Sequence, residues 1–331
     1  MSLSIGIVGL PNVGKSTLFN ALTKKSVPAE NYPFCTIDPS VGIVPVPDER
    51  LWELSELSKS AKTIPAVIEF VDIAGLVAGA SKGEGLGNKF LTNIREVDAI
   101  AHVVRTFQDN SVIHVENKVN PMDDIGVINL ELVLSDFETV SKRIANISKD
   151  LKKHDKDAIA EEIILNKLMS VFEKGEMATS ANLNEEEKFK IKSLNLLTLK
   201  PMLYVLNTSE AGENMEVGLP PDICYVKVDP VFEHGFDELI KKSYELLGLD
   251  TYFTTGEDET RAWTIKSGST APVAGIAIHT DFKDKFIRAE VVFWKDLIDA
   301  GSYPEARAKG KVRTEGKDYI VKNGDVVEFK I

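Results

Sequence analysis

The most constraining feature of the chain is a short glycine-rich segment near the start. Residues 9–16 read Gly-Leu-Pro-Asn-Val-Gly-Lys-Ser, the G-x-x-x-x-G-K-S pattern of a phosphate-binding loop. An apolar run before it predicts a buried strand, and residues 17–22 after it predict a helix. In this context the backbone N–H groups at a helix N-terminus point at a phosphate. The pattern therefore predicts an α/β fold of the P-loop nucleoside-triphosphatase (NTPase) type.

The residue types of this loop match the expected chemistry. Gly9 and Gly14 allow a close backbone approach that a β-carbon would obstruct. Backbone N–H groups from Asn12 to Ser16 would surround the β-phosphate, and Lys15 would reach the β and γ oxygens. The Ser16 hydroxyl would bind Mg²⁺.

Two later segments have the features of nucleotide-sensing switches. Thr36 lies in an extended, proline-containing loop and is a candidate Mg²⁺ and γ-phosphate contact; a plain strand-forming threonine is the alternative. Asp72 follows a predicted strand at residues 66–71 and would hold the Mg²⁺ shell, while Gly75 would offer its N–H to the γ-phosphate. Leu76 stands where many GTPases carry a water-orienting Gln, so we expect slow hydrolysis. His114 is a candidate general base, or else an ordinary surface histidine.

The base-recognition segment departs from the usual guanine motif. Residues 207–210 read Asn-Thr-Ser-Glu, where a GTP-specific protein carries N-K-x-D. Thr208 replaces the Lys, and Glu210 replaces the Asp that accepts hydrogen bonds from guanine. A displaced acceptor leaves polar groups imperfectly matched, so we expect adenine to be tolerated or preferred.

The middle of the chain has a helical pattern. Apolar residues from Leu130 to Leu151 repeat at spacings of three and four, which predicts a coiled-coil seam. A charged turn and two further helical stretches complete a predicted hairpin at residues 125–195. The hairpin is either a solvated spacer or an arm that reaches a partner. Its heptads could pair within one chain or between chains.

The C-terminal part is predicted to be a separate unit of short strands, at residues 262–265, 273–278 and 287–292 and again from residue 319. Asn323-Gly324 is a hairpin signal. A basic run (Arg307, Lys309, Lys311, Arg313, Lys317) could touch RNA phosphates or simply be solvated.

Composition limits the location and the partners. The net charge of −12 argues against nonspecific DNA binding. From residue 253 onward 13 basic and 13 acidic residues balance, so this part is the better candidate for nucleic acid. No apolar run approaches the roughly 18 residues of a membrane span, and no signal peptide is evident. With two cysteines far apart, we expect a cytoplasmic protein without disulfides.

Taken together, these motifs resemble the YchF/Obg-like ATPase family of P-loop NTPases. The segments that resemble the motifs of this family lie at residues 9–17, 31–37, 72–87, 90–95, 207–210, 261–265 and 315–321. The resemblance implies a Ras-like G domain with an inserted helical coiled-coil hairpin and a C-terminal TGS domain, which is a small ubiquitin-like β-grasp fold. It also implies ATP preferred over GTP, and binding to the ribosome or its subunits. RNA contacts through the TGS domain and the helical arm are then expected, with no membrane and no specific DNA.

The resemblance also implies site residues. Nucleotide contacts would fall on Asn12, Val13, Gly14, Lys15, Ser16, Thr17, Asn207 and Thr208, with Mg²⁺ ligands at Ser16 and Thr36. Glu210, the last residue of the base motif, is also a candidate nucleotide-binding residue. Asn12 occupies the place of an asparagine that supports K⁺ in related enzymes. The stretch from Glu210 to Leu247 is shorter than is usual for the family, which affects the base-pocket wall at residues 223–228.

We therefore expect three domains and an ATPase switch. The domain ranges are 1–124 with 196–248 for nucleotide binding, 125–195 for the helical insertion and 249–331 for the TGS domain. Lys15, Asp72, Gly75 and His114 would act in catalysis. The alternatives are a GTP-specific switch, or an RNA- or ribosome-binding protein whose nucleotide is structural.

Overall fold

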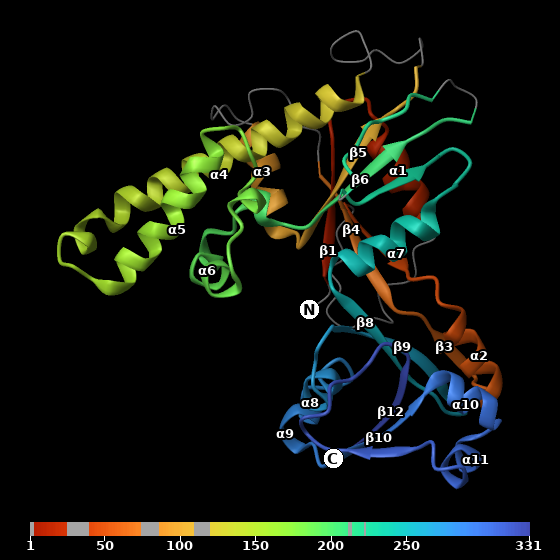
Figure 1. Ribbon diagram of the computed structural model, residues 1–331. Coiled ribbons are helices and arrows are strands. Elements are labelled where there is room, and N and C mark those ends of the chain that lie inside the picture. Colours follow the sequence, from red (N-terminus) through yellow and green to blue (C-terminus); the bar gives the residue numbers. More distant parts are fainter. Residues whose placement is uncertain (1–2, 25–39, 74–85, 109–119, 211–213, 222) are drawn as a thin grey trace. The chain divides into compact units, whose positions relative to one another are not determined.

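The computed structural model describes the chain except for residues 1–2, 25–39, 74–85, 109–119, 211–213 and 222 (Figure 1). Contacts divide the chain into two compact units. Unit 1 comprises Met1–Lys24, Ala29–Gly42 and Glu69–Leu239, and unit 2 comprises Lys25–Pro28, Ile43–Ile68 and Ile240–Ile331. This grouping differs from the predicted domain ranges: the helical insertion at residues 125–195 belongs to unit 1, and residues 43–68 and 240–248 belong to unit 2. Residues 43–68 group with the C-terminal unit because strand β3 (Lys62–Ile64) pairs with strand β9 (Glu259–Lys266).

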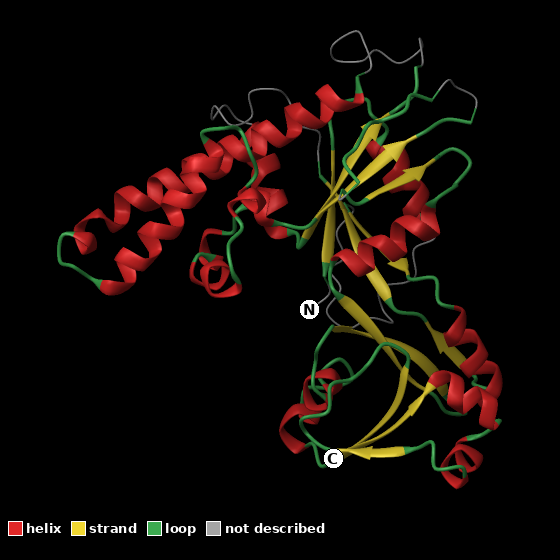
Figure 2. Cartoon of the chain, in the orientation of Figure 1, coloured by secondary structure: helices red, strands yellow, loops and turns green. Residues whose placement is uncertain are grey.

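A six-stranded sheet of order β2-β4-β1-β5-β6-β7 runs through unit 1 (Figure 2). Its strands are β1 (Ser4–Val8), β2 (Val41–Pro45), β4 (Val67–Asp72), β5 (Ala99–Arg105), β6 (Met202–Asn207) and β7 (Tyr225–Val228). The pairs from β4 through β1, β5 and β6 to β7 are parallel, with Ile7 opposite Asp72 and Arg105 opposite Asn207. Parallel strands end at one edge, so their last residues meet there. The predicted α/β P-loop fold is confirmed.

Helices cover this sheet because its central strands are apolar on both faces. Every residue of β5 is buried, and Ile125 of the long helix α4 packs on Val104, Tyr204 and Leu206 of β5 and β6. Unit 1 contains α1 (Lys15–Thr23), α3 (Leu86–Glu96) and α4 (Pro121–Leu151), while α7 (Phe236–Leu246) begins in unit 1 and ends in unit 2.

The predicted helical hairpin is present. Helix α4 has 31 residues, and α5 (Lys156–Phe172) returns along it after a turn capped by Asp155, whose side chain accepts from Ala158 N. Arg143 and Glu161 join the two helices with hydrogen bonds of 2.7 and 2.8 Å. The heptads thus pair within one chain. The sequence pattern predicts a third helix at residues 185–194. The structure has a shorter helix there, α6 (Glu185–Lys190), followed by the 3₁₀ turn η4 (Lys192–Leu194).

The prediction of the coiled-coil seam is wrong for one residue, Leu130. Val133, Val140 and Ile147 are buried against α5, but Leu130 is 49% exposed. Helix α5 is too short to reach that level of α4, where Ile128 and Leu132 are buried instead.

A buried carboxylate ties the hairpin to the sheet. Asp136 of α4 is fully buried and accepts hydrogen bonds from Leu197 N, Thr198 N and the Thr198 hydroxyl at 2.7–2.9 Å. Burial raises the pKa of Asp136, while these donors and the charge of Arg95 oppose the rise. The 3₁₀ turn η5 (Leu197–Leu199) is thereby fixed directly before β6.

Unit 2 contains a second sheet of order β11-β10-β12-β8-β9-β3. Its remaining strands are β8 (Leu249–Thr254), β10 (Arg288–Phe293), β11 (Arg313–Glu315) and β12 (Asp325–Lys330). The antiparallel pairs β8–β9 and β10–β12 are joined by a parallel contact of Val326 with Phe253. The unit also contains α2 (Glu49–Ser58), α8 (Ala271–Gly275), α9 (Asp281–Lys285), α10 (Trp294–Ala300) and α11 (Tyr303–Ala308).

Two predictions for this unit are wrong. Residues 273–278 are not a strand, because Pro272 at the first turn begins helix α8. Asn323 and Gly324 form a turn, with Gly324 at φ +93°, but the turn does not close a hairpin. Before the turn Ile320 bridges to Thr270, and after it β12 lies between β10 and β8.

A tight loop follows β7 and contributes to the carboxyl edge of the first sheet. Asp229 and His234 exchange two backbone hydrogen bonds of 3.0 and 3.1 Å, which close the loop. Gly235 leaves it at φ +79°, where a β-carbon would lie 2.1 Å from the Lys227 carbonyl oxygen. Only glycine fits this exit. Separately, none of the helices in the described parts of the chain is long and apolar enough to span a membrane.

Replacing Asp136 tests the tie between hairpin and sheet. Asp136→Ala leaves three donors without their acceptor, so we expect a loss of about 3 kcal/mol in the free energy of unfolding. The matched control is Asp150→Ala on the same helix, where the side chain is exposed, with an expected change within about 0.5 kcal/mol. Urea unfolding followed by circular dichroism measures both; equal midpoints for the two variants would contradict the role of Asp136.

Replacing Gly235 tests the loop exit. Gly235→Ala combines a left-handed backbone with a steric overlap. Gly248→Ala has φ +62° but nothing within 4 Å of the added carbon. We expect the control to lose about 1 kcal/mol and Gly235→Ala clearly more. Thermal unfolding of the two variants gives the comparison, and similar losses would show that the close approach to Lys227 is unimportant.

Candidate functional site

The phosphate-loop segment connects β1 to α1 as the sequence predicts. A β-carbon on Gly9 would lie 2.5 Å from the Val103 carbonyl oxygen, and one on Gly14, at φ +95°, would lie 2.3 Å from Asn207 Nδ2. Helix α1 has no side-chain N-cap and no acidic residue in its first turn. Its N-terminal N–H groups and positive dipole end therefore remain suited to an anion.

The base-motif asparagine is locked onto this loop. Asn207 ends β6, is buried, and donates from Nδ2 to the Val13 carbonyl oxygen at 2.8 Å. Its Oδ1 atom is also buried and has no hydrogen-bond partner among the described residues. A buried amide oxygen without a donor is costly, so this atom suits a donor from a bound ligand.

Lys15 faces an acidic residue at the same edge. Its side chain is buried, and Nζ donates to the Leu10 carbonyl oxygen at 2.7 Å. Burial lowers the pKa of Lys15 to about 8, while the charge of Asp72 opposes the shift. Burial raises the pKa of Asp72, opposed by Lys15. A bound polyanion would stabilise the ammonium form of Lys15.

These segments enclose one pocket of about 460 Å³. Its lining residues are Asn12, Val13, Gly14, Lys15, Ser16, Thr17, Arg105, Phe107, Asn207, Thr208, Ser209, Asp229, Pro230 and Val231. The structure thus brings together the loop residues and the base-motif residues Asn207 and Thr208. Thr208 is held by two hydrogen bonds to the Val228 carbonyl oxygen, 2.8 Å from its N–H and 3.0 Å from its hydroxyl.

Glu210 is different from its neighbours in the motif. It does not line the pocket, and its carboxylate oxygen lies 2.6 Å from His234 Nδ1. The side chain at the acceptor position of the usual guanine motif therefore contacts His234 and does not face the pocket.

Four residues singled out by the sequence lie outside the described part of the chain. Thr36, Gly75 and His114 lie outside the described residues, as does Leu76. Within the described ranges, no group of three or more His, Cys, Asp or Glu side chains could hold a metal ion. Of the predicted Mg²⁺ ligands, Ser16 is described and its side chain is exposed at the pocket.

Sequence reasoning missed the far wall of the pocket. Asp229 is buried and accepts from Glu210 N at 2.9 Å, Val231 N at 2.9 Å and Phe232 N at 3.2 Å, so it holds two loops together. An Asp-Pro pair directly after the last strand is a turn signal that could have drawn attention to it.

Arg105 was also missed. It ends β5, is buried beside the pocket, and donates from Nε to the Phe107 carbonyl oxygen at 3.1 Å. Its guanidinium carbon lies 4.9 Å from the centre of the Phe107 ring. The attraction between the guanidinium and the aromatic ring stabilises both side chains at this side of the pocket.

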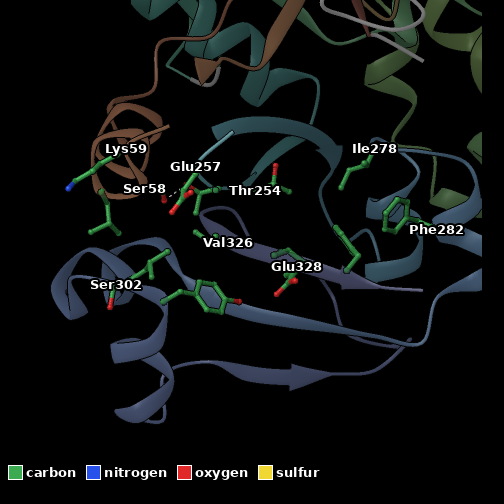
Figure 3. A pocket seen from close by; sticks show the side chains of 16 residues that line it. Ser58, Lys59, Thr254, Glu257, Ile278, Phe282, Ser302, Val326 and Glu328 are labelled. Carbon is green, nitrogen blue, oxygen red and sulfur yellow. Dashed lines mark hydrogen bonds between the residues drawn. The ribbon is translucent and has the colours of Figure 1, made fainter. Parts of the chain in front are cut away.

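A second, larger pocket of about 590 Å³ lies within unit 2 (Figure 3). Its sticks include Ser58, Thr254, Glu257, Phe282 and Glu328. It contains none of the predicted site residues, and among its lining residues Lys59 is the one cation, beside two glutamates. This composition does not suit a triphosphate, so the smaller pocket is the candidate nucleotide site.

Comparison with known proteins supports this assignment. A family model described as "50S ribosome-binding GTPase" matches residues 4–167, and the model YchF-GTPase_C, described as "Protein of unknown function (DUF933)", matches residues 249–331. The chain is 52% identical to "Ribosome-binding ATPase YchF" of Bacillus subtilis over 363 residues, covering 100% of this chain and 99% of the relative. It is 48% identical to the protein of the same name from Escherichia coli O157:H7 over 359 residues, covering 99% of each.

A solved structure agrees over the whole chain. The YchF GTPase of Schizosaccharomyces pombe superimposes with a TM-score of 0.87 at 37% identity, covering 99% of this chain and 98% of that one. The resemblance inferred from the motifs is confirmed, and the chain belongs to the YchF family of P-loop proteins.

Proposed function

We propose that this protein is a ribosome-associated ATPase that binds Mg²⁺-ATP in the P-loop pocket and hydrolyses it slowly as a translation-linked switch. The observation that carries the proposal is the contact of Asn207 with the phosphate loop, which puts a base-binding segment and a phosphate-binding segment around one cavity. The relatives named as ribosome-binding ATPases support it. A cytoplasmic location follows from a ribosomal partner.

Each part of the pocket has a role in this proposal. The backbone N–H groups from Asn12 to Thr17 surround the phosphates, and Lys15 neutralises charge on the transferring phosphoryl group. Asn207 and Thr208 hold the purine side. The buried, unpartnered Oδ1 of Asn207 supports this, since a donor on the base would satisfy it.

The ion site draws on few described residues. Mg²⁺, when bound, would supply positive charge that stabilises the phosphates. Ser16 and Thr36 are its proposed ligands, with Asp72 in the surrounding shell. Asn12, at φ +63° in the loop, is the proposed support for K⁺. Thr36 and Gly75 are the proposed γ-phosphate sensors, and His114 is the candidate base.

ATP is preferred over GTP in this proposal because the guanine-specific acceptor is not in the pocket. Thr208 stands where GTP-specific proteins carry Lys, and Glu210 is bound to His234. A GTP-specific switch is the second candidate, favoured by the family description "50S ribosome-binding GTPase".

We also propose that the C-terminal unit, interpreted as a TGS domain, contacts RNA. The basic run at residues 307–317 gives this proposal little support, because several of its cations lie next to carboxylates. Arg307 contacts Glu290, Lys311 lies 3.1 Å from Asp296, and Arg313 lies 3.8 Å from the buried Asp325. Such pairs reduce the charge available to phosphates. The basic run therefore does not carry the proposal alone, and we propose ribosome contacts by the helical arm as well as by this unit.

Replacing Lys15 tests the proposed function. In Lys15→Ala the phosphates lose their cation, so we expect at least roughly tenfold weaker ATP binding and no measurable hydrolysis. Lys24→Ala, at the exposed end of the same helix, is the control and should behave as the wild type. Calorimetry with ATP, GTP and ADP, with and without Mg²⁺, gives the affinities; much tighter GTP than ATP binding in the wild type would favour the GTPase alternative.

The pH dependence of ATP binding follows from the lowered pKa of Lys15, about 8 without nucleotide. Bound phosphates favour the charged lysine and raise its pKa, so above pH 8 binding must take up a proton. The affinity should therefore fall as the pH rises from 7.5 to 9.5, by at most about tenfold per unit. In Lys15→Arg the cation stays charged and the dependence should vanish. A flat profile in the wild type would contradict this role of Lys15.

A further inference from the structure

The side chains of Glu210 and His234 contact each other beside the purine side of the pocket. Glu210 Oε1 lies 2.6 Å from His234 Nδ1, and the two side chains are 53% and 65% exposed. Glu210 occupies the position whose carboxylate, in the usual guanine motif, accepts from the base. Here that carboxylate faces solvent and a histidine.

The backbone of Glu210 nevertheless stays at the pocket wall. Its N–H donates to Asp229 Oδ2 at 2.9 Å, and both Ser209 and Asp229 line the pocket. A side chain starting there has only to rotate to point toward a bound base. The direction it takes is therefore set by its partner.

His234 is itself held firmly. It closes the loop through two backbone hydrogen bonds to Asp229, its ring centre lies 6.3 Å from that of Phe232, and Gly235 fixes the exit of the loop. An imidazole on a fixed backbone can anchor a flexible carboxylate.

We propose that His234 is a positioning residue for base selection, which holds the Glu210 carboxylate out of the purine pocket and so disfavours guanine. This inference rests on the proposed function, since it concerns the same nucleotide site. It adds a selectivity element outside the four-residue base motif.

The chemistry of the two purines gives the direction. Guanine presents N1–H and N2–H₂, two donors that a carboxylate accepts. Adenine presents N1, an acceptor, at the same edge and would be repelled by a carboxylate. Removing the carboxylate from the pocket therefore withdraws a contact that guanine needs and spares adenine.

The test is the ratio of GTP to ATP affinity in the full-length protein. His234→Ala frees Glu210, so we expect GTP binding to tighten relative to ATP by about three- to fivefold, because the gain cannot exceed the strength of the exposed Glu210–His234 contact. In the double variant His234→Ala with Glu210→Ala this gain should disappear. Glu210→Ala alone should leave the ratio near that of the wild type, because the carboxylate is not in the pocket. His279→Ala, which removes an exposed histidine 3.8 Å from Asp281 in unit 2, is the matched control.

The outcomes are distinct. A ratio within twofold of wild type in His234→Ala, or a gain that persists without Glu210, would overturn the inference. So would a large loss of ATP affinity in Glu210→Ala. Glu210→Ala also tests the inference if His234→Ala fails to fold. Wild-type ATP binding and its loss in Lys15→Ala report on the proposed function independently of this ratio.

Discussion

The contact between Asn207 and the phosphate loop is the interaction on which the site depends. Gly14 has no β-carbon, so the Asn207 amide can approach closely and donate to the Val13 carbonyl oxygen at 2.8 Å. The two residues are far apart in the chain and meet because β1 and β6 both flank β5 in a parallel sheet. This hydrogen bond joins the phosphate loop to the end of β6, so both line the same pocket. In the proposed function, a nucleotide spans the two segments with its phosphates and its base.

That contact in turn requires β6 to return accurately after a long helical insertion. Asp136 fixes the segment before β6 to helix α4, and Lys200 donates to the carbonyl oxygens of Arg95 and Val97 at 3.1 and 2.5 Å. These polar ties join the insertion to the chain before β5. A displacement of the hairpin would therefore be transmitted to β6 and to Asn207 at its end.

The sequence predicts this structure well where neighbouring residues determine the conformation, and less well where distant contacts do. The phosphate loop, its strand and its helix follow from neighbouring residues. The apolar pattern of residues 273–278 favours a strand, but Pro272 begins a helix directly before it. Leu130 was assigned to the seam because periodicity alone does not show where the partner helix α5 ends.

The purine side was the hardest part to predict, for a physical reason. Asp229 and His234 act on Glu210 from a loop after another strand, and side-chain pairing between loops leaves no periodic pattern in the sequence. The alignment with the Bacillus subtilis relative spans 363 positions against 331 residues here, so that relative contains residues that this chain lacks. Loops accept such changes in length at small thermodynamic cost, whereas the parallel strands do not. The phosphate-loop end of the pocket is consequently fixed by the sheet, while its other end is formed by loops at the edge of the sheet.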